Sequence, residues 1–127
     1  MSVRLVTAKK GLSAETYGQS YLDGRGQGAY ANVYAASLAS AKALALINEG
    51  DLLGCVVAHE VGHLLLGKNS HSPEGLMRAK WEVGQLLDAT HGNLGFSAAE
   101  AELMRARYLS AESERAEVVS MALTARR

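Results

Sequence analysis

The sequence predicts an α+β domain, in which a small antiparallel or mixed sheet packs on a buried helix and C-terminal helices cover the other side. The first 35 residues contain three short segments rich in β-branched and aromatic side chains, separated by glycine-containing turns. From residue 37 onward the chain is rich in Ala and Leu and is interrupted by glycines that suit helix ends. Strands followed by a run of helices are typical of the α+β class.

The composition fits one ordinary domain. The chain has 127 residues, 13 Lys and Arg against 13 Asp and Glu, and a single cysteine, Cys55. We expect one domain over residues 1–127, with residues 110–127 forming a helical or frayed tail. The balanced charge does not favour nucleic acid or an anionic membrane as a partner. A lone cysteine excludes both an internal disulfide and a cysteine-based zinc knuckle.

No apolar run is long enough for a transmembrane helix, and no apolar export segment follows the first ten residues. We therefore expect a chain that works away from membranes, in the cytoplasm by default.

Three segments of the N-terminal third are expected to be strands. Val3–Thr7 is short and β-branched. Thr16–Leu22 and Ala29–Ala35 flank a loop with three glycines, which predicts a hairpin.

Two helices are expected to follow the strands. Ser37–Glu49 contains neither Gly nor Pro and precedes Gly50, which suits a helix with a glycine stop. Asp51 is the expected cap of a second helix, which ends at Gly67.

Two further helices are expected in the C-terminal half. Trp81–Ala89 is a short candidate, bounded by a turn at His91. Ser97 and Glu100 form a capping-box pattern, which predicts a C-terminal helix.

The second helix carries the candidate chemistry. Apart from Cys55, its ionisable side chains after the first turn are His59, Glu60 and His63, and the rest is apolar, so we expect it to be buried. A buried carboxylate needs a compensating partner such as a cation. His59 and His63 lie one turn apart, so both imidazoles can reach one ion, whereas Glu60 is offset by about 100° and suits a role beside the ion.

This is the HExxH arrangement, in which two histidines bind zinc and the glutamate polarises the bound water. The alternative is structural, with two core histidines and a salt-bridged glutamate. A catalytic zinc takes a third protein ligand. His71, which follows a glycine able to turn the chain, is the candidate, while His91 lies in a turn without a motif and is expected at the surface.

Residues 59–77, HEVGHLLLGKNSHSPEGLM, resemble the metzincin clan of zincin metallopeptidases, whose signature HExxHxxGxxH precedes a turn with a methionine. The resemblance implies one Zn²⁺ per chain and hydrolysis of peptide bonds in a peptide or protein substrate. It implies zinc ligands His59, His63 and His71, the general base and acid Glu60, the turn glycine Gly67 and the Met-turn residue Met77.

The spacing departs from the clan in one respect. Three residues, not two, separate His63 from Gly67, and three separate Gly67 from His71. The extra residue before Gly67 lengthens the outgoing path of the chain and the extra residue after it lengthens the return, so the two can offset each other and still bring His71 back to the helix. The alternative third ligand is a carboxylate of the following helix, as in gluzincin-like peptidases, with Glu82 best placed and Glu74 second.

The expected function is zinc-dependent cleavage of peptide bonds by a metalloendopeptidase. Two alternatives come from other classes: a zinc-bearing interaction domain without turnover, and a zinc hydrolase of a non-peptide amide or ester. Glu60 argues against the interaction domain, because a purely structural site has no use for a water-activating carboxylate.

Overall fold

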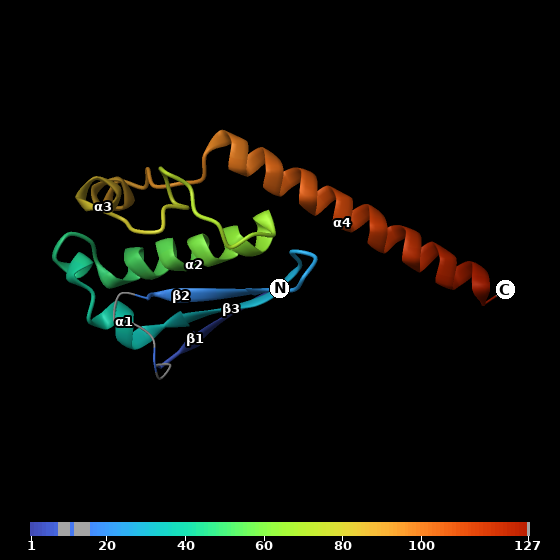
Figure 1. The fold of residues 1–127 in the computed structure, drawn as a ribbon, viewed down its shortest axis with the longest axis horizontal. Helices are drawn as coiled ribbons and strands as arrows, with labels where there is room; N and C mark the ends of the chain where they lie inside the picture. The colour runs from blue at the N-terminus through green and yellow to red at the C-terminus, as the bar shows by residue number, and fades with distance from the viewer. Residues whose placement is uncertain (8–10, 12–15, 127) are drawn as a thin grey trace.

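A computed structural model describes residues 1–7, 11 and 16–126, and its architecture confirms the expected α+β class (Figure 1). Three strands come first and the helices follow. Their bounds are β1 (Ser2–Val6), β2 (Gly18–Leu22), β3 (Gly28–Tyr34), α1 (Ala35–Ala39), the 3₁₀ helix η1 (Lys42–Ala45), α2 (Glu49–Leu66), α3 (Val83–Thr90) and α4 (Ala98–Ala125).

The sheet has the order β1-β3-β2 and is mixed, since β1 runs parallel to β3 and β2 runs antiparallel to it. Side chains alternate between its two faces. Tyr21 and Tyr30 are register partners whose rings stack at 4.6 Å between centroids. Ser20 pairs with Ala31 in the next register position, and both are buried. The three expected strands are therefore present, with bounds shifted by one or two residues.

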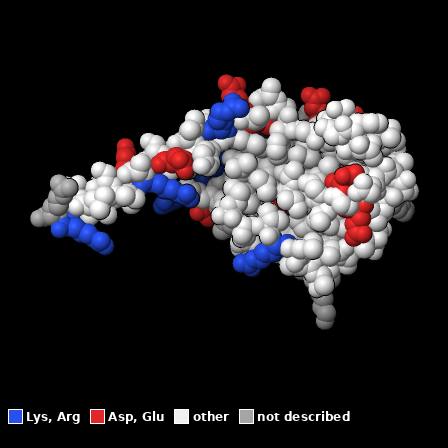
Figure 2. Space-filling view, turned by 180° about the vertical axis from the view of Figure 1, so that it is seen from behind, with Lys and Arg blue, Asp and Glu red and all other residues white. Residues whose placement is uncertain are grey.

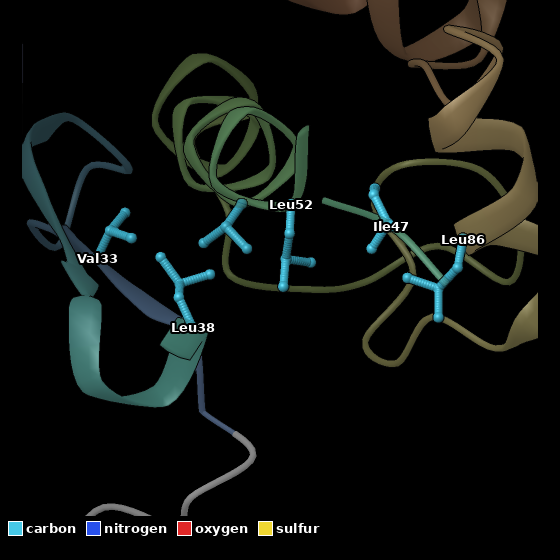
Figure 3. Packing of buried hydrophobic residues seen from close by; sticks show 6 residues of the cluster. Val33, Leu38, Ile47, Leu52 and Leu86 are labelled. Carbon is cyan, nitrogen blue, oxygen red and sulfur yellow. The ribbon is translucent and has the colours of Figure 1, made fainter. Parts of the chain in front are cut away.

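Helix α2 is the central layer of the molecule. It packs on β2 and β3 on one side, while α3, the start of α4 and the intervening loop lie on the other (Figure 1). Its largely apolar sequence allows burial on both sides. The main core lies at its N-terminal end (Figure 3) and comprises Val33, Leu38, Ile47, Leu52, Val56 and Leu86.

The expected helix over Ser37–Glu49 is wrong. The chain forms α1, an extended residue at Ala41 and then the turn of η1. Leu38 and Ile47 both enter the main core. They are nine residues apart, and nine steps of about 100° would place them on opposite faces of one straight helix. The burial of Leu38 and Ile47 in the same core therefore outweighs the helix propensity of the alanines between them.

The start of α2 also differs from the expectation. Asn48, rather than Asp51, is the cap, because its Oδ1 accepts a hydrogen bond from the Asp51 amide at 2.8 Å. Asp51 lies in the first turn, where a carboxylate is favoured by the helix dipole.

Helix α4 begins with the expected capping box. The Ser97 hydroxyl accepts from the Glu100 amide at 3.2 Å, and the Glu100 carboxylate accepts from the Ser97 amide at 2.8 Å. The helix then leaves the body of the molecule (Figure 1), and residues 111–126 are exposed. The expected tail is thus helical as far as Ala125, and only the first half of α4 contributes to the cover over α2.

Charged side chains are sparse on the body and mixed in sign along the projecting helix on the face shown in Figure 2. Among the helices of the described residues, none has the length and apolar character needed to cross a bilayer.

Candidate metal centre

Three histidines converge beside α2. The Nε2 atoms of His59 and His63 lie 3.1 Å apart. A ring nitrogen of His71 completes a group of three ligand atoms that all lie within 4.8 Å of one another. Tetrahedral zinc with bonds of 2.0–2.1 Å places its ligand nitrogens about 3.3 Å apart. The separation of the His59 and His63 nitrogens is close to this value, and His71 lies near enough to serve as a third ligand.

Backbone carbonyls fix the orientation of the two buried rings. The Nδ1 of His59 donates to the carbonyl oxygen of Leu76 at 2.8 Å, and the Nδ1 of His63 donates to that of Lys68 at 2.9 Å. A carbonyl only accepts hydrogen bonds, so each Nδ1 carries the proton. Each Nε2 then presents a lone pair to the centre, as metal-binding histidines require.

The return of the chain to the centre depends on Gly67. This residue ends α2 at a φ of 67°, a left-handed conformation that favours glycine. The turn brings the Lys68 carbonyl back onto His63 and places His71 against both other rings, with centroid separations of 5.3 and 4.9 Å. The two added residues in the spacing therefore do not keep His71 from the cluster.

The alternative carboxylates lie outside this group of donors. Glu82 is exposed, caps α3 and forms an ion pair with Arg78 at 3.6 Å. Glu74 is also exposed. Among the described residues, the candidate metal-holding group consists of the three histidines.

Burial makes the two helical histidines good ligands. Burial, together with the neighbouring His63 and His71, lowers the pKa of His59 to about 4, against the opposing effect of the hydrogen bond to Leu76. Burial likewise lowers the pKa of His63. Both rings are therefore neutral near pH 7, the state in which imidazole binds a metal.

Glu60 is buried against the edge of β2, with 5% of its surface exposed. Ser20 lies within hydrogen-bonding distance of both its Oε2 and, at 2.9 Å, its backbone oxygen. Gly18 leaves the space for the carboxylate, since a Cβ there would lie 2.6 Å from Oε1. Burial raises the pKa of Glu60, while the hydrogen bond with Ser20 opposes the rise.

Met77 is completely buried and packs against Gly62, the residue next to His63. Any side chain at Gly62 would overlap its sulfur. Met77 thus supports α2 at the turn that carries the second ligand, together with Leu66 and Met104.

A cleft of about 890 Å³ opens beside the histidine cluster. Polar side chains converge in the cleft, and much of the rest of its lining is apolar. This combination is typical of a binding site. Its lining includes His59, Glu60 and His71 and the apolar side chains of Val56, Trp81 and Leu86.

Two other residues singled out in the sequence lie elsewhere. His91 is exposed at the end of α3, as expected. Cys55 is a half-buried free thiol, and burial raises its pKa.

Sequence reasoning missed three groups that act on the centre: Ser20, the Leu76 carbonyl and Trp81. The hydroxyl of Ser20 is recognisable only once the strand register is known. Trp81 could have been noticed in the sequence, because it is the single tryptophan, it follows the expected Met-turn residue Met77 by four residues, and an indole N–H needs a hydrogen-bond partner when buried.

No family model, curated protein or solved structure matches this chain. The candidate metal centre accordingly rests on the geometry of its own residues.

Proposed function

We propose that the chain is a zinc-dependent metallopeptidase, with His59, His63 and His71 as ligands and Glu60 as general base. The observation that carries the proposal is the convergence of three imidazole nitrogens beside a cleft that His59 and His71 line together with the buried carboxylate of Glu60. Imidazole suits zinc, and three protein ligands leave a fourth position for water. The resemblance of residues 59–77 to the metzincin clan supports the same function.

Zinc, when bound, would lower the pKa of a water molecule and stabilise negative charge on the substrate carbonyl oxygen. The Glu60 carboxylate takes the proton of the attacking water and then returns it to the leaving amine. The apolar lining of the cleft would receive an apolar side chain of the peptide.

The first experiment measures metal content by mass spectrometry, on protein purified without added metal or chelator. We expect about one zinc per chain. Absence of metal, with none taken up on adding zinc, would remove the enzyme proposal and leave an interaction domain as the better explanation.

The second experiment measures cleavage of a denatured, fluorophore-labelled protein with and without a chelator. Glu60→Gln should retain zinc and lose at least about 100-fold in rate, the lower range for loss of a general base. Glu112→Gln is the matched control, because it makes the same change on the exposed part of α4. A rate that Glu60→Gln leaves unchanged contradicts the mechanism, and turnover of esters or small amides alone indicates a non-peptide substrate.

A further inference from the structure

The carbonyl oxygen of Leu76 accepts two hydrogen bonds. One comes from Nδ1 of His59 at 2.8 Å and the other from Nε1 of Trp81 at 3.1 Å. A carbonyl has two lone pairs, so both donors can be accommodated. Leu76 is buried, and its own amide donates to the Gly95 carbonyl at 2.9 Å. The group that orients His59 is therefore itself held by Trp81 and Gly95.

The indole of Trp81 also contacts His59 directly. The two rings meet edge to face, with centroids 5.7 Å apart and an interplanar angle of 81°. An indole has a single polar donor, here directed at Leu76. Rotation of Trp81 would therefore break both the hydrogen bond and the ring contact.

We propose that Trp81 is a positioning residue for His59 and thereby a determinant of metal affinity. This inference rests on the proposed metal centre. Loss of the indole N–H leaves the Leu76 carbonyl with the histidine as its one side-chain donor and frees the segment that follows it. The ring of His59 then has a wider range of orientations, of which fewer direct Nε2 at the ion. Outer-shell changes of this kind typically cost 10–100-fold in metal affinity, and we expect about tenfold.

The test compares Trp81→Phe, which keeps an aromatic ring but removes the donor, with Tyr108→Phe. Tyr108 is exposed and donates to Glu112 on α4, so the control removes an aromatic donor that belongs neither to the histidine cluster nor to the lining of the cleft. Zinc affinity is measured by competition with a chromophoric chelator, and ligand geometry by the absorption spectrum of the Co²⁺-loaded protein. We expect about tenfold weaker zinc binding and an altered Co²⁺ spectrum for Trp81→Phe, with Tyr108→Phe within twofold of the original chain.

Unfolding of the metal-free proteins in urea separates positioning from general stability. If Trp81→Phe lowers the unfolding midpoint but leaves zinc affinity and the Co²⁺ spectrum unchanged, Trp81 is only structural and the inference is overturned.

A measurement on the unaltered chain does not depend on the variant folding. Trp81 is the single tryptophan, so the indole N–H gives one distinctive NMR resonance. We expect slow exchange of this proton with solvent and a shift when zinc is added. Zinc binding without a shift overturns the inference alone, whereas failure of the chain to bind zinc overturns the proposed metal centre as well.

Discussion

His71 is the exposed member of the histidine cluster and the one that reaches it from a loop. We expect His71→Ala to weaken zinc binding by more than about 100-fold, beyond the usual effect of an outer-shell change. Glu82→Gln is the matched test of the alternative ligand and should leave affinity within about twofold, because Glu82 pairs with Arg78 instead. Competition with a chromophoric chelator measures the zinc affinity of both variants. The opposite order of effects would assign the third ligand to Glu82.

Gly18 is the residue that lets Glu60 lie against β2. Gly18→Ala should destabilise the fold and displace the carboxylate, because the new Cβ would lie 2.6 Å from Oε1. Gly54→Ala is the control on α2, where a Cβ meets nothing within 4 Å. There the same change should stabilise by about 0.5–1 kcal/mol, since alanine is the better helix former. Urea unfolding compares the two, and equal effects would contradict the close packing of Glu60.

The sequence predicted single residues well where a regular period fixes them. His59 and His63 share a face of α2 because helix geometry brings residues four apart together. Ser20 and Trp81 could not be predicted in this way. Ser20 reaches Glu60 across a sheet–helix contact, and Trp81 reaches Leu76 through an irregular loop, and neither distance follows from local spacing.

Among the elements, α4 is joined to the rest of the molecule by Arg107. Its Nε donates to the Leu65 carbonyl at 3.1 Å and its Nη2 donates to the Gly26 carbonyl at 3.0 Å. One side chain thereby connects α4 to the end of α2 and to the β2–β3 turn.

Arg107→Met keeps most of the aliphatic stem and removes both hydrogen bonds. We expect a loss of about 2 kcal/mol in the free energy of unfolding, the usual scale for bonds from a charged donor. Arg105→Met, at an exposed position of the same helix, should change it by less than about 0.5 kcal/mol. Chemical denaturation provides both values. Similar losses for the two variants would mean that Arg107 does not anchor α4.

Element types were predictable from patterning, but the break between α1 and η1 was not. Strands, the buried helix and the Ser97 cap follow from period, apolar content and capping residues. The break arises because Leu38 and Ile47 must enter one core, and only the tertiary structure imposes that demand.

For the molecule as a whole, the main core borders the candidate metal centre, since Val56 and Leu86 also line the cleft, but it contains none of the candidate ligands. The six core residues are aliphatic and none is a candidate ligand, so the metal-free chain should remain folded. Zinc at 100 times its dissociation constant stabilises a folded protein by about 2.7 kcal/mol, which corresponds to a rise in Tm of roughly 10 °C for a chain of this size. Calorimetry with zinc and with chelator measures the rise.

Two single variants test the origin of this stabilisation. His63→Ala should abolish the zinc-dependent rise in Tm, and His91→Ala, an exposed histidine outside the cluster, should retain it. A rise that survives in His63→Ala would place the bound zinc elsewhere on the chain.

The projection of α4 has a practical consequence for handling the protein. Residues 111–125 continue the helix for about 20 Å beyond its packed first turns, at 1.5 Å per residue. The segment acts as a spacer, so a fluorophore, affinity tag or solid support attached at its far end stands well clear of the cleft. Because this half of the helix lacks tertiary support in the described structure, its rigidity depends on its own helix-forming residues, and cooling or added trifluoroethanol should stiffen the spacer.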